Sequence, residues 1–355
     1  MNMMHQYIVR ETGAVVNERL IADRTIDILY NQLREHAPTL FRALTSKRMS
    51  SLLGFLHFDL NLPMASHKGI RLLERMGVDW LECIAPEHRF TTPRQVFERQ
   101  IRYQDLRPMD PNPEAIVSPA DAKVLIGSLK DTPELFIKGK FFSAMELLGE
   151  DSPWCAPFAQ SDFALFRLTP DKYHYNHAPV SGEVVDIYEL DGSYHSCNPR
   201  AVIALASHHA KNRRMVTIID TNVVGGSGIG LVAMIEVVAL MIGDIVQCYS
   251  ATGYDNPQPV VKGMHLAKGC PKSLYRPGSS TDILLFQQGT VTFSEDLRQN
   301  VGRWDVRSRF SSGLGRPLVE TDVKVRSTIA VKRGNDLAGP IPDVATLAQT
   351  IPGTP

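Results

Sequence analysis

From residue 115 onward the chain is divided into short apolar or β-branched runs, and this pattern restricts the available folds more than any other feature. The runs are separated by Gly, Pro, Asn or Asp, which favour turns, and each run has the length of a single strand. They are Ala115–Val117, Ala122–Ile126, Glu183–Tyr188, Val202–Ala206, Met215–Ile219 and Ile283–Phe286. The pattern predicts a β-rich core.

The region before this core has a helical pattern. Residues 15–90 carry apolar side chains at mixed spacings of three and four residues, which is the period of an α-helix. Within it, residues 49–60 are amphipathic, and we expect this helix to cover a sheet or, as the alternative, to contact a membrane surface. We predict an α+β fold with a helical N-terminal region over 1–95, a β-rich core over 96–335 and a flexible tail over 336–355.

Composition and charge exclude several classes of protein. The chain has 355 residues, 43% of them hydrophobic, which is enough for a substantial core. The 38 basic and 38 acidic residues cancel, which argues against a nucleic-acid-binding protein. Five cysteines without a CxxC motif indicate free thiols in a reducing compartment. The most apolar segment, 229–242, is too short for a membrane span and contains Glu236, so we expect buried strands and a cytoplasmic protein.

The sequence Pro277-Gly278-Ser279-Ser280 directly precedes the last apolar run and has the chemistry of a self-cleavage site. Glycine has no Cβ, so another atom can approach the carbonyl of Gly278 closely. If a base removes the proton of the Ser279 hydroxyl, the oxygen can attack that carbonyl and convert the amide into an ester. Elimination would leave a dehydroalanine, which hydrolyses to a pyruvoyl group at the new N-terminus. Alone, such a tripeptide is more often a turn.

Two other segments supply the base and the acid that this chemistry needs. His174 and His177 lie three residues apart in the proline-bounded segment 170–179, and Asp121 ends the segment Ser118-Pro119-Ala120-Asp121. A serine becomes nucleophilic when a histidine takes its proton, and an acid on the far ring nitrogen fixes the tautomer. A histidine-bearing loop or half of a metal site is the alternative, but no carboxylate or cysteine follows at ligand spacing.

In order along the chain, the Ser-Pro-Ala-Asp, Tyr-His-x-x-His-x-Pro and Gly-Ser-Ser motifs resemble those of the phosphatidylserine decarboxylase family, over about residues 97–293. The resemblance implies that Asp121, His177 and Ser279 form a self-cleavage triad that cuts the Gly278–Ser279 bond. It also implies that Ser279 becomes the covalent pyruvoyl (pyruvate) cofactor, and that His174 transfers a proton during decarboxylation. It implies no metal.

The resemblance is incomplete just before the cleavage site. The family usually has Leu-Gly-Ser-Thr or Gly-Gly-Ser-Ser where this chain has Pro277-Gly278-Ser279-Ser280. Its Lys-Gly pair is matched by Lys268-Gly269, but Pro271 and Ser273 replace the acid and the glycine that usually follow. We therefore expect substrate preference to be the property in which this chain differs most from the family that it resembles.

Three functions remain open. The first is conversion of phosphatidylserine to phosphatidylethanolamine and CO₂, with peripheral membrane contact through residues 49–60 that depends on Leu53, Phe55 and Leu56. The second is decarboxylation of a free aromatic amino acid such as tryptophan, favoured by the zero net charge and by an Ala37–Phe41 stretch that resembles soluble fungal-type relatives. The third is an unprocessed binding protein, which the intact Asp121, His177 and Ser279 disfavour. The resemblance ranks the lipid enzyme first, as a homo-oligomer of processed two-chain protomers.

Overall fold

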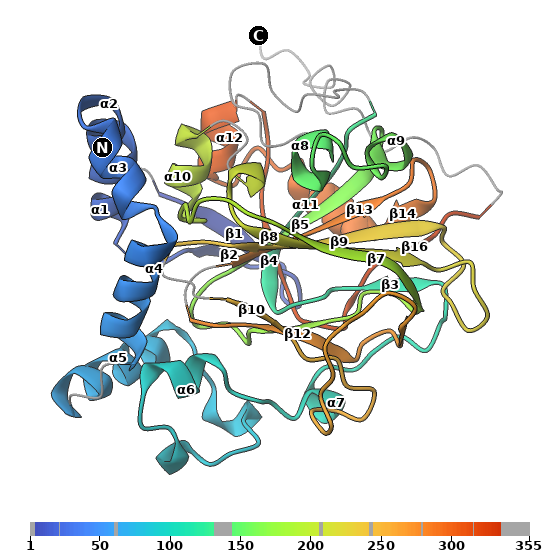
Figure 1. Cartoon of the computed structure of the whole chain (residues 1–355), viewed down its shortest axis with the longest axis horizontal. Coiled ribbons are helices and arrows are strands. Elements are labelled where there is room, and N and C mark those ends of the chain that lie inside the picture. Colours follow the sequence, from blue (N-terminus) through green and yellow to red (C-terminus); the bar gives the residue numbers. More distant parts are fainter. Residues whose placement is uncertain are drawn as a thin grey trace, which may run out of the picture.

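The computed structural model describes residues 4–20, 22–59, 63–130, 144–205, 209–240, 244–277, 280–314 and 316–334. Figure 1 shows an α+β fold in which helices surround a large central sheet, as predicted. The predicted cleavage-site residues Gly278 and Ser279 lie outside the described residues, and so do Leu60 and the predicted tail over 336–355.

The central sheet has ten strands within the described residues, in the order β11-β7-β8-β9-β13-β5-β4-β15-β1-β2. Neighbouring strands are antiparallel except for β1 and β15, which are parallel. The strands are β1 (Gln6–Val9), β2 (Val15–Asn17), β4 (Ala122–Ser128), β5 (Asp162–Leu168), β7 (Gly182–Leu190), β8 (Arg214–Asp220), β9 (Leu231–Val238), β11 (His265–Leu266), β13 (Ser280–Phe286) and β15 (Thr321–Val323).

Two smaller sheets, each of three strands among the described residues, accompany it. One has the order β10-β12-β6 and the other β14-β16-β3. Their strands are β3 (Ala115–Val117), β6 (Tyr175–His177), β10 (Ile245–Gln247), β12 (Pro271–Tyr275), β14 (Val291–Phe293) and β16 (Thr328–Lys332).

Strand residues of the central sheet alternate between two hydrophobic clusters, because successive side chains point to opposite faces. Met234 and Leu284 pack in a cluster that also contains Ile245 and Phe293 of the small sheets. The strand residues next to them in the sequence point to the other face of the sheet and pack in a second cluster with side chains of the helices that cover this face. Residues 231–238 of the segment 229–242 accordingly form the buried strand β9, as expected, and residues 241 and 242 lie outside the described residues. Among the described residues, no helix combines the length and apolarity needed to cross a bilayer.

The helices fall into an N-terminal set, of which those up to residue 76 lie on one flank of the molecule (Figure 1), and a set distributed over the core. The first set contains α1 (Asp23–Asp27), α2 (Arg34–His36), α3 (Pro38–Leu44), α4 (Lys47–Gly54), α5 (Pro63–Met76), α6 (Pro93–Phe97), α7 (Tyr103–Leu106), the π-helices η1 (Ile28–Leu33) and η2 (Phe55–Asp59), and the 3₁₀ turns η3 (Trp80–Glu82) and η4 (Glu87–Arg89). The second contains α8 (Ala144–Leu148), α9 (Cys155–Phe158), α10 (Pro199–Ala204), α11 (Glu295–Val301), α12 (Arg309–Leu314) and the 3₁₀ turn η5 (His209–Lys211).

Two predictions of secondary structure were wrong. The predicted helical region 1–95 begins with the hairpin β1–β2, which is closed by Gly13 at a φ of +68° and pairs with β15 of the central sheet. The predicted strand Val202–Ala206 is part of helix α10 over its first three residues. Here the Asn198 side chain caps the helix by accepting a hydrogen bond from the Arg200 N–H at 2.9 Å, and Pro199 occupies the first turn.

Candidate active site

Three adjacent strands bring the predicted processing segments to one end of the central sheet. Asp121 directly precedes β4, and Ser280, the first residue of β13, pairs with Leu168 at the end of β5. Because β5 lies between β4 and β13 and runs antiparallel to both, Asp121 and the beginning of β13 lie at the same end. The predicted cleavage bond, Gly278–Ser279, lies one residue before Ser280 in the sequence.

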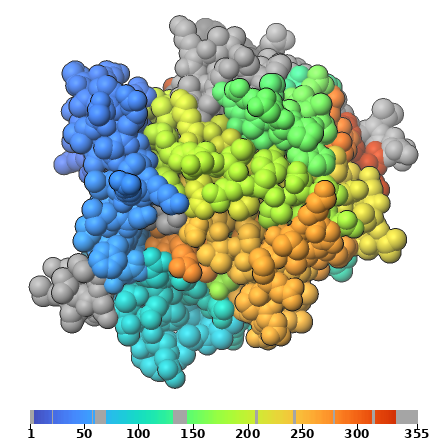
Figure 2. Space-filling view, viewed as in Figure 1, coloured from blue at the N-terminus to red at the C-terminus, as the bar shows by residue number. Residues whose placement is uncertain are grey.

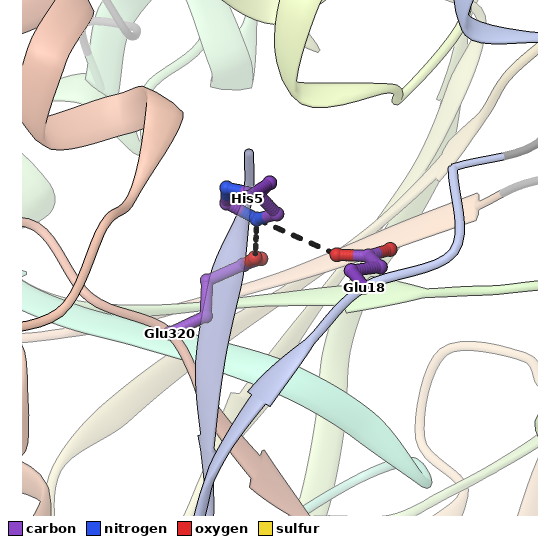
Figure 3. A group of neighbouring side chains, drawn as sticks. All are labelled: His5, Glu18 and Glu320. Carbon is purple, nitrogen blue, oxygen red and sulfur yellow. Dashed lines mark hydrogen bonds and ion pairs between the residues drawn. The ribbon is translucent and has the colours of Figure 1, made fainter. Parts of the chain in front are cut away.

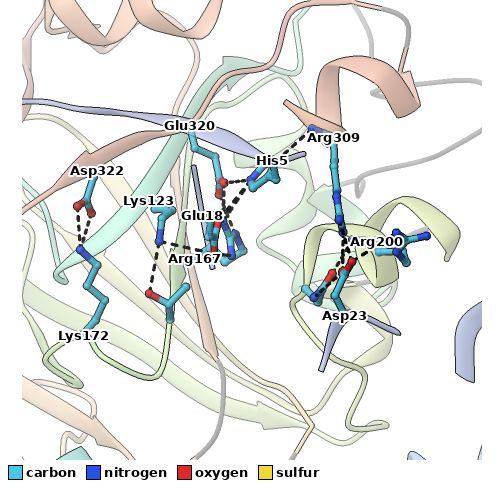
Figure 4. A network of polar contacts seen from close by, with 12 residues as sticks. His5, Glu18, Asp23, Lys123, Arg167, Lys172, Arg200, Arg309, Glu320 and Asp322 are labelled. Carbon is cyan, nitrogen blue, oxygen red and sulfur yellow. Dashed lines mark hydrogen bonds and ion pairs between the residues drawn. The ribbon is translucent and has the colours of Figure 1, made fainter. Parts of the chain in front are cut away.

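Strand β6 brings the histidine motif to the same place. The backbone N–H of His177 donates to the carbonyl of Pro119 at 2.7 Å, two residues before Asp121. The N–H of Tyr275, on the chain that leads to the cleavage site, donates to the carbonyl of His174 at 3.1 Å. Lys172 anchors the motif to β15 through Asp322 at 2.7 Å (Figure 4). Asp121, the histidine motif and Ser280, which is the described residue of the Gly-Ser-Ser motif, therefore lie together.

The ring of His177 is held in one tautomer by its two hydrogen bonds. Its Nδ1 lies 2.8 Å from the carbonyl oxygen of Gly269, and its Nε2 lies 2.9 Å from the hydroxyl of Tyr173. A carbonyl can only accept, so Nδ1 carries the proton and the lone pair is on Nε2. Complete burial lowers the pKa of His177 to about 3, despite the opposing effects of the Gly269 carbonyl and the Asp121 charge. At neutral pH the ring is therefore a neutral base.

Asp121 is buried and charged, but it does not hydrogen-bond to His177 as the expected triad requires. Arg107 donates to its two oxygens at 3.1 and 2.8 Å, and the Val325 N–H donates at 2.8 Å. Burial opposes ionisation, but the charge and hydrogen bonds of Arg107 outweigh it and lower the pKa of Asp121. Asp121 therefore acts on His177 as a nearby negative charge, while the backbone of Gly269 orients the ring.

The position of the residue 269 carbonyl, which accepts from His177 Nδ1–H, depends on this residue being glycine. Its φ is +75°, and an added Cβ would lie 2.3 Å from the Met109 sulfur. We expect Gly269→Ala to slow self-cleavage at least tenfold, because the shifted carbonyl would no longer hold Nδ1–H. Gly263 is a matched control, since its φ is +84° with nothing within 4 Å of an added Cβ.

Both alanine variants should lose about 1–2 kcal/mol of stability from the left-handed conformation. Only the variant at Gly269 should process slowly in a time course of freshly made protein followed by mass spectrometry. Equal processing rates in the two variants would remove Gly269 from the mechanism.

The partners of the ring and of the acid were not identified from the sequence. Tyr173 belongs to the recognised motif, but the sequence did not indicate its role. Its hydroxyl oxygen also lies 2.7 Å from that of Tyr254. The sequence showed that Lys268-Gly269 matches a Lys-Gly pair of the family, but it did not show that the Gly269 carbonyl binds the His177 ring. Arg107 and Tyr254 had no sequence signal, because neither lies in a motif.

His174 has a different environment from His177. Its ring is fully buried and stacks on Phe97 with the ring centroids 3.5 Å apart. Burial, together with the positive charge of Arg99, holds its pKa well below the ordinary value. Neither ring nitrogen has a hydrogen-bond partner of good geometry among the described residues. A neutral histidine with free nitrogens can exchange a proton with a bound molecule.

Other buried polar atoms without a hydrogen-bond partner belong to residues near His174 in the sequence or to the first residues of β13. Within the described part of the chain, they include the hydroxyls of Ser280 and Thr281, one carboxyl oxygen of Asp282 and the side-chain oxygen of Asn176. Buried polar atoms are nearly always paired, so unpaired ones call for a functional explanation. Their position next to the predicted cleavage bond marks this region as the candidate active site.

One of the altered residues before the predicted cleavage site, Ser273, belongs to a buried polar network together with its neighbour Lys272. Lys272 and Ser273 of β12 both bond to Glu236 of β9, with a Lys272–Glu236 distance of 2.7 Å. Burial opposes ionisation of Glu236, but the Lys272 charge lowers its pKa. Asp282, opposite Glu236 in the sheet, has its pKa raised well above the ordinary value by burial and by the Glu236 charge. The departure from the family motif is therefore matched by an internal partner.

A possible metal-ligand group lies elsewhere, beside strands β1 and β2. The ligand atoms of His5, Glu18 and Glu320 all lie within 4.8 Å of one another (Figure 3). Arg167, however, donates to each carboxylate at 2.6 Å through the same nitrogen, which lies 3.5 Å from His5 Nε2 (Figure 4). The guanidinium already supplies the positive charge, so the group cross-links the N-terminal hairpin to β5.

Comparisons with known proteins agree with the motifs. A family model described as phosphatidylserine decarboxylase matches residues 94–311, more than half of the chain. A phosphatidylserine decarboxylase proenzyme of Fusobacterium nucleatum is 28% identical over 300 residues, covering 83% of this chain and 91% of the relative. Proteins of the same name from Bordetella petrii and Chlamydia trachomatis are 30% and 28% identical, covering 63% and 87% of this chain and 79% and 96% of the relatives. The chain belongs to the phosphatidylserine decarboxylase family.

Proposed function

We propose that this protein is a pyruvoyl-dependent decarboxylase that cleaves itself at Gly278–Ser279 and converts phosphatidylserine to phosphatidylethanolamine and CO₂. The observation that carries the proposal is the neutral, oriented ring of His177 beside Asp121 at the end of the sheet where β13 begins. The relatives' shared name, phosphatidylserine decarboxylase proenzyme, supports both the reaction and the processing.

In the proposed processing, Nε2 of His177 takes the proton of the Ser279 hydroxyl. The oxygen attacks the Gly278 carbonyl, the C–N bond breaks as the imidazolium gives its proton to the departing Ser279 nitrogen, and an ester replaces the amide. The charge of Asp121 stabilises the imidazolium that forms, while Gly269 accepts from Nδ1–H throughout. Loss of the Ser279 α-proton then expels the Gly278 carboxylate. The resulting dehydroalanine takes up water and releases ammonia, which leaves the pyruvoyl ketone.

The residues that remain suit such a group. A pyruvoyl group supplies a ketone that captures the substrate amine and accepts the electron pair released as CO₂ leaves. The unpaired hydroxyls of Ser280 and Thr281 are donors at the start of β13, where the new N-terminus would begin. His174 holds a proton at a ring nitrogen without a competing partner, which suits return of that proton to the α-carbon.

A lipid substrate requires contact with a bilayer, and the α4–η2 helix supports this. Leu52, Phe55 and Leu56 are 49, 51 and 45% exposed, and their spacing puts them on one helical face. Phe58 is buried against Phe97 on another side. We had expected the exposed face to contain Leu53, Phe55 and Leu56, but Leu53 is half-buried and Leu52 takes its place. We define the apolar face as Leu52, Phe55 and Leu56.

The apolar face predicts reversible binding to vesicles. Changing Phe55 and Leu56 together to serine should weaken binding to phosphatidylserine vesicles at least tenfold, because each apolar side chain loses about 1.5–3 kcal/mol of burial when fully inserted. Leu81→Ser is the control, since Leu81 is 80% exposed outside this helix. Flotation on a density gradient measures both. An equal loss in the control, or none in the double variant, would count against the apolar face.

The function itself is tested by mass and by substrate. Intact-mass analysis should give a fragment of residues 279–355, which is 77 residues by subtracting 278 from 355. The processed protein should release CO₂ from phosphatidylserine in detergent and lose this activity after reaction with a carbonyl reagent. A single 39.5 kDa chain that never matures would contradict the proposal. CO₂ released from free tryptophan and not from phosphatidylserine would favour the amino-acid decarboxylase instead.

A further inference from the structure

A cavity of about 250 Å³ lies between the helical flank and the strands that lead to the cleavage site. Ser51, Gly54 and Phe55 of α4–η2 line one side, and Asp244, Arg276 and Pro277 line the other, with Arg94 completing the wall. Figure 2 shows the blue helical flank, the cyan segment and the orange strands meeting on one face of the molecule. The apolar face shares Phe55 with this cavity.

The charges of the lining residues are compensated with one exception among the described residues. Arg94 is paired with both Asp59 and Glu98, at 2.7 and 2.8 Å. Asp244 accepts from Arg213 at 3.0 Å. Arg276 is exposed, and its guanidinium has no hydrogen bond or ion pair with the described residues. Arg213 also pairs with Glu189 at 2.6 Å, so Arg94 and Arg213 are each shared between two carboxylates. Arg276 is the lining arginine that has no carboxylate partner among the described residues, so its guanidinium can bind an anionic ligand.

The position of Arg276 is set by backbone contacts that do not involve the cleavage bond. Its N–H donates to the Asp244 carbonyl at 3.0 Å, and the preceding residue, Tyr275, pairs with Ile245 of β10. The Tyr275 N–H also bonds to the His174 carbonyl at 3.1 Å. Arg276 is thus tied through its backbone to the strand next to His174.

We propose that Arg276 binds the phosphodiester of the substrate headgroup. The inference rests on the proposed function and adds the group that recognises the substrate. In a serine phospholipid the reacting amine, the phosphate and the acyl chains follow in that order. In the protein, Arg276 directly follows Tyr275, whose N–H bonds to the His174 carbonyl, and it lines a cavity that shares Phe55 with the apolar face. A guanidinium offers two parallel donors that match two phosphate oxygens. A free amino acid has no group for this position, so Arg276 selects the phospholipid.

The test compares Arg276→Gln with Arg276→Lys and with Arg307→Gln, a change of an exposed arginine that does not line the cavity. Maturation is followed by intact mass, and turnover is measured with dihexanoyl phosphatidylserine, which needs no vesicle. Arg276→Gln should mature normally and raise KM about tenfold to a hundredfold with a smaller change in kcat, because a charge-assisted hydrogen bond is lost. The KM of Arg276→Lys should lie between those of the unaltered protein and Arg276→Gln, and the KM of Arg307→Gln should equal that of the unaltered protein.

Binding separates this inference from the proposed function. Glycerophosphoethanolamine and inorganic phosphate are titrated by calorimetry into Ser279→Ala protein, with and without Arg276→Gln, so that neither maturation nor turnover is required. We expect the diester to bind more tightly than phosphate, and the second change to abolish its binding. Equal diester binding with and without Arg276, or binding of phosphate alone, would overturn the inference. A processed protein that does not turn over phosphatidylserine would contradict the proposed function. The binding measurement would then still decide whether Arg276 binds the diester.

Discussion

Replacing His177 by alanine is expected to leave a single unprocessed chain of 39.5 kDa, whereas replacing His174 is expected to give a processed but nearly inactive protein. The two rings differ in their contacts. Nε2 of His177 is the oriented base, and its loss should slow self-cleavage by about 10²–10⁴-fold. His174 has unpaired ring nitrogens in a separate environment, and its loss should lower decarboxylation by a similar factor after the pyruvoyl group has formed.

The two variants are compared with Ser279→Ala, which should be neither cleaved nor active. Intact mass reports cleavage, a carbonyl-reactive label reports the pyruvoyl group, and CO₂ release reports turnover. Asp121→Asn should cleave slowly, because the negative charge that stabilises the imidazolium is lost. A His174→Ala protein that fails to mature would move His174 into the processing step, and normal cleavage by His177→Ala would reject its role as the base.

Replacing Lys272 by methionine is expected to lower the free energy of unfolding by about 3–5 kcal/mol, because Glu236 would remain as a buried charge without its cation. Such a loss is a large part of the stability of an ordinary domain, about 5–15 kcal/mol. Both side chains are fully buried, so water cannot replace the missing partner. The same loss should disturb the beginning of β13, where Asp282 lies opposite Glu236.

Urea denaturation of the Ser279→Ala background measures this effect without interference from processing. Lys262→Met is the control, since Lys262 is exposed. Lys272→Met combined with Glu236→Leu should recover most of the stability, because an apolar pair needs no compensating charge. A single Lys272→Met variant as stable as the control would show that Glu236 is compensated in another way.

Much of the fold was predictable because short apolar runs between turn residues have few alternatives to a strand. The prediction failed where local and global preferences conflict. Val202 lies in an apolar run, but Asn198 and Pro199 cap it as a helix. The hairpin β1–β2 lies in a region of helical pattern, and its pairing with β15 requires residues more than 300 positions away. Such long-range pairing leaves no signal in a local window.

The sequence by itself predicted which bond is cut and which side chains supply the base, the acid and the nucleophile. That information resides in residue identity: a serine after a glycine, two histidines three apart and an aspartate ending a strand-like run. Only the tertiary structure decided how these groups are held. Arg107 holds Asp121 at both oxygens, and the carbonyl of Gly269 orients His177. Every residue has a backbone carbonyl, so the one that reaches a histidine ring is selected by packing and backbone angle, which residue identity alone does not specify.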